Sequence, residues 1–169
     1  MSERSSRSIL SRMTRSTSPL VEPGAILRSL SEAEAAALVT AWLHAFGQQR
    51  QGLNLKAYLW HVFSGGAHAS WAGKQALAEY EAMEAPEYLV LSNDRKTAFS
   101  TDQRPVKADL SDYLVFPPNL AWTMCFTHED GWLGPYFAKH RDFDRLDVAN
   151  RAQIRKQREA HAARAKGWR

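Results

Sequence analysis

A short polar run, His128-Glu129-Asp130, places an imidazole and two carboxylates next to one another before a glycine. A second histidine, His61, lies in the aromatic segment 59–63. Two imidazoles and a carboxylate can bind zinc or iron, and the same groups can transfer protons as a general acid–base pair. Asp-Gly is also typical of a β-turn, because Asp bonds to nearby backbone and Gly adopts a positive φ. We favour the turn, and keep His61, His128, Glu129 and Asp130 as a candidate site, of which His61, His128 and Asp130 are the metal-ligand candidates.

Exposed aromatic and polar turn residues form a second candidate site, for a protein partner. Trp132 lies in a turn between two glycines, where a large side chain is difficult to bury, and Tyr136 follows in the same segment. Asn93 and Asp94 lie in a polar stretch between two apolar runs. They can contact a partner at a loop tip, but the interpretation we favour for these two residues is an Asx-turn.

Several catalytic signatures are missing from the sequence. It contains no glycine-rich phosphate loop, no GxSxG motif and no HExxH motif. The single cysteine, Cys125, lies within an apolar run, which predicts a buried and unreactive thiol. We therefore lean against an enzyme and predict no cofactor, with a divalent metal at the histidines as the alternative that stays open.

The charge of the chain is concentrated at its two ends. The net charge is +4 over 169 residues, yet residues 1–20 hold four arginines against one glutamate and residues 150–169 hold seven basic residues against one. The segment between them is therefore acidic. Four basic residues at the C-terminal end have a spacing that can follow phosphates, so nucleic acid is a possible partner, although we favour a solvated helix. They are Arg151, Arg155, Lys156 and Arg158.

The same composition limits the location of the chain. No apolar run approaches the roughly 20 residues of a membrane-spanning helix, so we expect no membrane partner. No secretory signal is present, which predicts a cytoplasmic protein. We expect a disordered Ser/Arg-rich leader at 1–24, a single domain at 25–149 and a basic helical or disordered extension at 150–169.

Three helices are expected to frame the candidate sites. Ser31 and Glu34 match a capping box and predict a helix over 32–46. Further helices are predicted over 72–84 and 142–166 from their apolar spacing.

Apolar runs between polar turns predict the strands. They are 59–63, a hairpin of 88–91 with 97–101, a second hairpin of 113–116 with 122–127, and an edge segment over 132–137 that contains Pro135. The expected fold is α+β, with a small antiparallel sheet of about five strands and two or three helices packed on one face.

Two segments together resemble a known family. Leu59-Trp60-His61-Val62-Phe63-Ser64, followed by Thr127–Gly131 and Gly134–Phe137, is similar to an uncharacterised bacterial family, the domain of unknown function 4275. The resemblance covers about residues 30–137. It implies a fold and a bacterial, cytosolic setting, and it carries no activity or catalytic residue.

The sequence therefore supports three hypotheses of function. The first is a protein-interaction module of a regulatory or immunity type, by analogy of size and acidity. The alternative is a metal-dependent hydrolase that uses His61, His128 and a carboxylate. The third is nucleic-acid binding through the basic extension.

Overall fold

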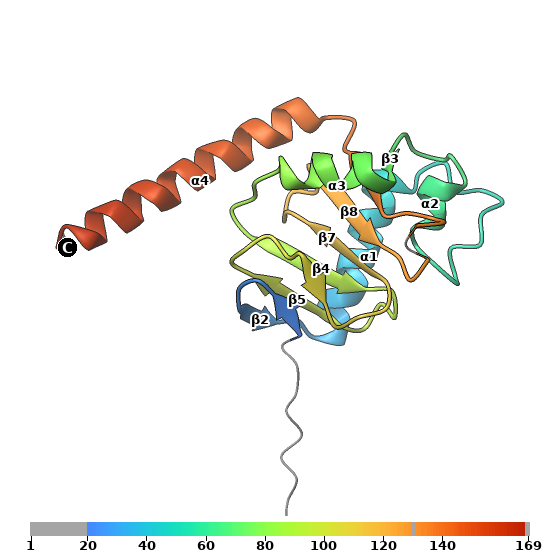
Figure 1. Cartoon of the computed structure of the whole chain (residues 1–169), viewed down its shortest axis with the longest axis horizontal. Coiled ribbons are helices and arrows are strands. Elements are labelled where there is room, and N and C mark those ends of the chain that lie inside the picture. The colour runs from blue at the N-terminus through green and yellow to red at the C-terminus, as the bar shows by residue number, and fades with distance from the viewer. Residues whose placement is uncertain (1–19, 130, 168–169) are drawn as a thin grey trace, which may run out of the picture.

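Seven short strands form one antiparallel sheet in the order β2-β5-β4-β7-β8-β9-β3, and β1 and β6 form a separate two-stranded ribbon (Figure 1). This computed structural model describes residues 20–129 and 131–167. The strands are β1 (Val21–Glu22), β2 (Ile26–Ser29), β3 (Trp71–Ala72), β4 (Tyr88–Ser92), β5 (Ala98–Thr101), β6 (Lys107–Ala108), β7 (Tyr113–Phe116), β8 (Trp122–Phe126) and β9 (Tyr136–Lys139).

Helices cover both faces of this sheet, whereas the sequence analysis placed them on one. Every residue of β4 and β7 is buried. Leu89 and Leu91 pack in a cluster with α1 (Glu32–Phe46), while Tyr88 and Val90 pack in a second cluster with α3 (Gly73–Glu81). Continuous apolar runs such as Tyr-Leu-Val-Leu are typical of strands that are buried on both faces. The α+β class is confirmed, but the sheet is larger than the five strands expected.

The helix α1 begins and ends where its sequence predicts. Ser31 accepts a hydrogen bond from the backbone of Glu34, and the Glu34 side chain accepts one from the backbone of Ser31, which completes the capping box. Trp42 is fully buried against the sheet, and its Nε1 donates to Thr123 Oγ1 at 3.0 Å. This bond satisfies the indole of a core tryptophan.

The segment 59–63 is not a strand, contrary to our expectation. Instead, α2 (His61–Ser64) is a single helical turn that ends at Gly65. A five-residue apolar run does not distinguish a strand from a buried helical turn by its periodicity. The turn packs on the same face of the sheet as α1, where Val62 and Phe63 join its cluster.

The segment around Pro135 is also not an edge strand. β9 begins one residue after this proline and pairs with β8 on one side and β3 on the other. Pro135 precedes the ladder, so its missing N–H removes no hydrogen bond from it. β3 pairs with β9 at two positions, which is too short a strand to recognise from sequence.

The long helix α4 (Phe143–Ala165) leaves the body of the molecule after β9, and its C-terminal part projects outward (Figure 1). Ile154 is buried and Arg158 forms an ion pair with Glu84 at 3.0 Å, so the helix contacts the body beyond residue 150. At the other end, β1 lies inside the predicted leader 1–24, and its Val21 is buried. Residues 1–19 lie outside the described residues. No helix of the described chain is both long and apolar enough to cross a membrane.

Candidate functional site

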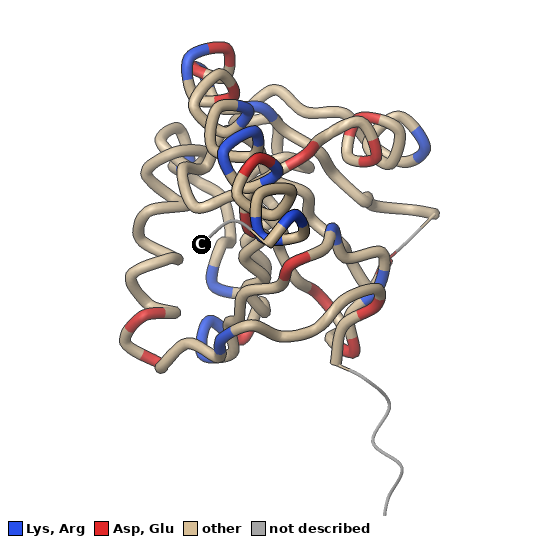
Figure 2. The backbone as a smooth tube through the Cα atoms, turned by 90° about the vertical axis from the view of Figure 1, so that its left-hand side faces the viewer, with Lys and Arg blue, Asp and Glu red and all other residues tan. Residues whose placement is uncertain are grey.

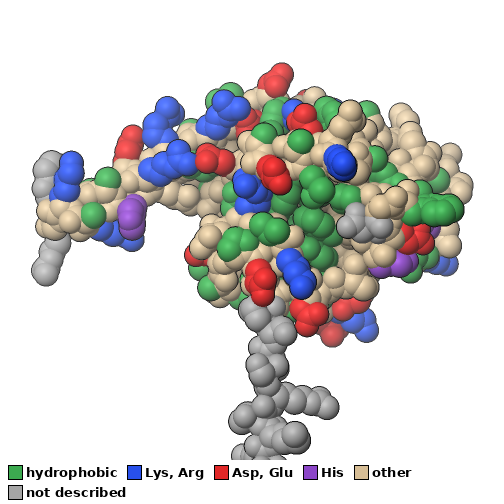
Figure 3. Space-filling model, in the orientation of Figure 1, with side chains coloured by type: hydrophobic (Ala, Val, Ile, Leu, Met, Phe, Trp, Pro, Cys, Tyr) green, Lys and Arg blue, Asp and Glu red, His purple; other side chains and the backbone are tan. Residues whose placement is uncertain are grey.

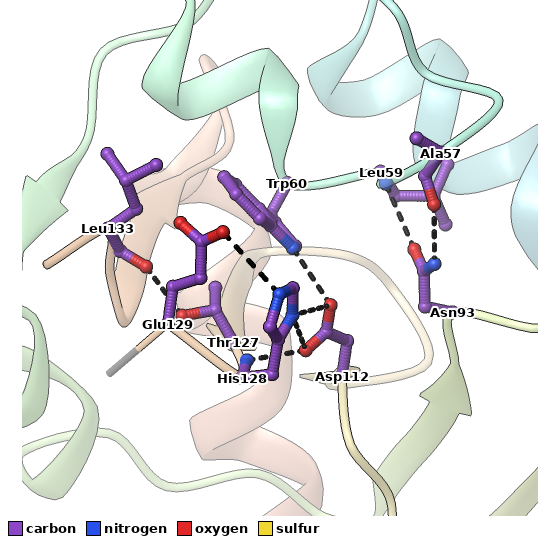
Figure 4. A network of polar contacts seen from close by, with 9 residues as sticks. All are labelled: Ala57, Leu59, Trp60, Asn93, Asp112, Thr127, His128, Glu129 and Leu133. Atoms are coloured by element: carbon purple, nitrogen blue, oxygen red, sulfur yellow. Dashed lines mark hydrogen bonds and ion pairs between the residues drawn. The ribbon is translucent and has the colours of Figure 1, made fainter.

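Strand register brings three segments to one end of the sheet. Ser92 at the end of β4 pairs with Tyr113 at the start of β7, and Tyr113 pairs with Phe126 at the end of β8. The β4–β5 turn, Asp112 and the loop after β8 therefore begin side by side (Figure 4). The segment that leads into α2 lies against the same end, because Trp60 bonds to Asp112.

Asp112 is the centre of a polar network at this end. Its side chain is only 2% exposed. The carboxylate accepts a hydrogen bond from Trp60 Nε1 at 3.2 Å and another from the backbone N–H of His128, and His128 Nδ1 lies 2.9 Å from both of its oxygens (Figure 4). A buried carboxylate is costly unless donors surround it, and these groups supply the donors.

The network fixes the orientation of His128. Because a carboxylate only accepts, Nδ1 carries the hydrogen and Nε2 faces away from Asp112. The His128 side chain is 39% exposed, and its Nε2 lies 3.5 Å from Glu129 Oε1. The hydrogen bond to Asp112 raises the pKa of His128, partial burial opposes this, and the charges of Asp112 and Glu129 raise it further. An imidazole held by a buried carboxylate is the arrangement that positions a general base.

Aromatic rings surround the network. The Trp60 ring stacks with that of Tyr58, at a centroid distance of 5.2 Å, and with that of Tyr136, at 6.1 Å. Both candidate histidines lie against the Tyr58–Trp60 pair: His61 is 4.6 Å from the Trp60 ring, and His128 is 5.0 Å from the Tyr58 ring. The structure therefore brings the two histidines to the same aromatic pair.

The two histidines do not form a metal-binding group with the other described residues. Nδ1 of His61 lies 2.8 Å from the backbone oxygen of Asn54, and Nδ1 of His128 bonds to Asp112. Within residues 20–129 and 131–167, no group of three or more His, Cys, Asp or Glu side chains is placed to hold a metal. Asp130, the third predicted ligand, lies outside the described residues.

Asn93 and Asp94 bond to their own chain. Asn93 Oδ1 accepts from the backbone of Leu59 at 3.1 Å, and its Nδ2 donates to the backbone oxygen of Ala57 at 2.8 Å (Figure 4). Asp94 accepts from the backbone N–H groups of Lys96 and Thr97 at 2.8 and 2.9 Å. Partial burial acts against ionisation, but these hydrogen bonds outweigh it and lower the pKa of Asp94. The Asx-turn we favoured accounts for the contacts of Asp94, which accepts from the backbone two residues on. It does not account for Asn93, whose side chain bonds instead to the distant segment 57–59.

Trp132 and Tyr136, the other two interface candidates, have opposite environments. Tyr136 is buried against Trp60, and burial raises the pKa of its hydroxyl. Trp132 is 86% exposed. Its loop is held by its own hydrogen bonds, since Glu129 O accepts from the backbone of Trp132 and Leu133, and Thr127 Oγ1 donates to Leu133 O.

Gly134 closes this loop and has a backbone that other residues rarely adopt. Its φ is +99°, and a Cβ there would lie 2.9 Å from the Thr127 side chain. A substitution would therefore both strain the backbone and collide with Thr127. The sequence needs glycine at this point for the loop to return to β9.

The four candidate basic residues of α4 are all exposed. Arg151 pairs with Asp147 of the same helix at 2.7 Å and Arg158 pairs with Glu84 of the body, while Arg155 and Lys156 complete the set. Viewed towards the C-terminal end of the helix, Lys and Arg lie on several of its sides (Figure 2), and basic side chains gather along its projecting part (Figure 3). Nucleic-acid binding by these residues stays a prediction.

Asp112 is the functional candidate that the sequence analysis missed. It stands in a Ser-Asp-Tyr sequence directly before β7. Its position before a buried strand is a weak signal, because acids also occur there in ordinary turns. Cys125 is buried as predicted, and burial raises the pKa of its thiol.

Comparison with known proteins identifies the family. The family model described as Domain of unknown function (DUF4275) matches residues 16–137, more than half of the chain. The chain belongs to this family. The DUF4275 segment contains Trp60, Asp112, His128 and Trp132, whereas α4 lies beyond its end. No curated protein and no solved structure matches the chain significantly.

Proposed function

We propose that this DUF4275 chain is a protein-interaction module of a regulatory or immunity type, which acts in the bacterial cytoplasm and binds its partner through the β8–β9 loop. The observation that carries the proposal is the exposure of Trp132, 86% of whose surface is open to solvent. Tryptophan is enriched among the residues that contribute most to binding, because it buries a large apolar surface. An indole in solvent therefore favours a contact surface.

Hydrogen bonds hold the described residues on both sides of this indole. Hydrogen bonds from Trp132, Leu133 and Thr127 close the loop on itself. Bonds from the backbone and ring of His128 to Asp112 fasten its start to the sheet. Backbone that is already held by such bonds loses less freedom when a partner binds, which favours affinity.

The surroundings of Trp132 define the chemistry of the partner. His128 and Glu129 are each 39% exposed and lie at the start of the same loop. We expect the partner to offer an apolar pocket for the indole and polar groups at its rim that match an imidazole and a carboxylate.

Site-specific photocrosslinking tests the proposal. A benzophenone amino acid replaces Trp132 in the full chain, and a matched chain carries it at Val106, which is 70% exposed on a different segment. In the cells that make the protein, we expect the benzophenone at position 132 to crosslink to one partner protein. The benzophenone at position 106 should not crosslink to that partner.

Competition completes this experiment. Excess untagged native chain should remove the adduct, and excess Trp132→Ala chain should not. Equal crosslinking from both positions, or competition by Trp132→Ala as strong as by the native chain, contradicts the proposal.

A second candidate function is acid–base chemistry at His128, and the Asp112–His128 pair favours it. A buried carboxylate that fixes Nδ1 leaves Nε2 free to take a proton. If this function is correct, His128→Gln should abolish any hydrolysis found in a substrate screen, and Asp112→Asn should reduce it. Metal analysis of the native chain and of a His61→Ala, His128→Ala double variant tests the hydrolase hypothesis in its metal-dependent form.

A further inference from the structure

A pocket of about 480 Å³ lies beside β3, and none of its lining residues belongs to the Asp112–His128 network. The β3–β9 ladder stops at the pair Trp71–Phe137, two residues before Lys139. The pocket opens beyond this point, between the end of α1, the 67–69 loop and the chain that leaves β9. Six of its lining residues carry the argument: Phe46, Gln48, His68, Trp71, Lys139 and Arg141.

The charged groups of the pocket favour an anion. Lys139 and Arg141 line it beside the imidazole of His68, and none of the described lining residues is acidic. Lys139 Nζ forms an ion pair with Glu79 Oε2 at 3.4 Å, and Glu79 does not line the pocket. Arg141 Nη1 lies 3.4 Å from the amide oxygen of Gln48, a long contact that leaves the guanidinium donors available to a ligand.

The aromatic groups of the pocket favour a planar ring. Phe46 and Trp71 line it together, and His68 packs edge-on against Phe46 at 5.4 Å. Lys139 Nζ lies 5.2 Å from the centre of the Trp71 ring, so a cation and an aromatic face are already adjacent. The volume lies in the range of small-molecule sites, about 300–1,000 Å³.

His140 lies next to Lys139 and Arg141 in the chain and packs close to the pocket. Burial lowers the pKa of His140, Asp142 opposes this, and the positive charges of Arg141, His68 and Arg145 lower it further. The His140 ring lies 6.1 Å from that of Phe46. The Arg141 guanidinium therefore acts on a ring that lies beside Phe46, which lines the pocket.

We propose that the pocket binds a small organic anion that carries an aromatic ring, with the ring against Trp71 and the anionic group at Arg141 and Lys139. The Arg141 guanidinium matches the geometry of a carboxylate or a phosphate. This site is independent of the partner surface at Trp132.

Titration of the full chain followed by two-dimensional NMR tests the proposal. The probes are indole-3-carboxylate and adenosine 5′-monophosphate, each with a neutral counterpart, indole-3-carboxamide and adenosine. We expect at least one anion to shift the indole N–H of Trp71 with a millimolar or tighter Kd, and its neutral counterpart to bind about tenfold more weakly because it lacks the charged bond. The anion that binds distinguishes a carboxylate ligand from a phosphate ligand.

A pair of arginine variants supplies the control. Arg141→Gln should weaken binding of that anion about tenfold, whereas Arg145→Gln, which removes the same charge from an exposed position outside the lining, should leave it within about twofold. Unchanged thermal unfolding of both variants shows that the fold is intact. The proposal is overturned if the charged and neutral probes bind equally, or if the two substitutions have equal effects. It is also overturned if neither anion shifts the Trp71 signal at a probe concentration of about 10 mM, ten times a millimolar Kd.

Discussion

Two loops at the same end of the sheet use their residues in opposite ways. In the β4–β5 turn, Asn93 and Asp94 direct their polar groups to backbone atoms of their own chain. In the β8–β9 loop, backbone bonds to Glu129 hold the chain, and Trp132 is left in solvent. Polar side chains that bond to the backbone stabilise the fold, and this role explains why they are present. A large apolar side chain in solvent does not stabilise the fold, so its presence has another explanation.

Asp112 connects the two loops. Its backbone oxygen accepts from the N–H of Asn93 at 3.0 Å, and its carboxylate binds the ring and backbone of His128. One buried residue therefore holds the start of both loops. Substitutions in the two loops test whether the residues that stabilise the fold are different from the residue that is exposed for contact.

The largest effect on stability is expected from Asp112→Ala. It leaves the buried Nε1 of Trp60 and the backbone N–H of His128 without their acceptor. We expect a loss of about 3 kcal/mol in the free energy of unfolding, measured by urea denaturation. Asp112→Asn retains the shape and one acceptor oxygen, and should lose less.

A loss below about 1 kcal/mol for Asp112→Ala would show that another contact holds the two loops together. In that case hydrogen exchange of the His128 amide would also be unchanged. We expect instead that the His128 amide exchanges faster in Asp112→Ala, because the substitution removes its carboxylate acceptor, whereas the Asn93 amide keeps the backbone oxygen of residue 112 as its acceptor.

Asn93→Ala is expected to have the next largest effect. The substitution removes two bonds to the partly buried segment 57–59 and leaves the N–H of Leu59 and the oxygen of Ala57 unpaired. We expect a loss of about 2 kcal/mol by the same measurement.

The neighbouring substitution Asp94→Ala supplies the control, because its bonds lie at an exposed turn, and should lose about 1 kcal/mol or less. A larger loss at Asp94 than at Asn93 would reverse the ranking and show that the turn itself, and not its contact with 57–59, stabilises this end.

The pH dependence of stability distinguishes the contribution of the His128 ring from that of the His128 backbone N–H bond. Its pKa is raised in the folded chain, mainly by the hydrogen bond to Asp112. The folded state therefore binds the proton more tightly than the unfolded state. The stabilisation is complete below the unfolded value and is lost as pH rises through the folded value.

We expect the difference in melting temperature between the native chain and His128→Gln to be larger at about pH 5.5 than at about pH 8.5. NMR titration of the His128 ring should give a pKa above the ordinary 6.5 in the native chain and a lower value in Asp112→Asn. A His128 pKa that Asp112→Asn leaves unchanged would show that the carboxylate does not hold the ring.

The sequence predicted the elements of this fold more completely than the contacts between them. The capping box at Ser31 and the two hairpins are local signals, and the structure confirms each of these elements. The order of strands depends on contacts far apart in sequence, so the position of β9 between β8 and β3 and the pairing of β2 with β5 were not visible. The strands β1, β3 and β6 have only two residues each, too few to show a period.

The candidate site shows the same limit at the level of single residues. His128 and Trp132 stand out by type, and their loop was predicted as a turn. Asp112 is distant from Trp60 in the chain, and only the packing of α2 against the end of β7 brings them together. A buried acid next to an apolar strand has no pattern of its own, because its partners come from other segments.

The smallest effect on stability is expected from Trp132→Ala. The side chain is 86% exposed, so its removal takes little buried surface from the folded state. We expect the free energy of unfolding to change by no more than about 0.5 kcal/mol, as for most exposed positions. A loss above about 1 kcal/mol would show that the indole packs on the fold, and would remove the contrast with Asn93. Full stability, together with failure of the Trp132→Ala chain to compete for the photocrosslinked partner, would instead mean that the β4–β5 turn maintains the fold and Trp132 makes the contact.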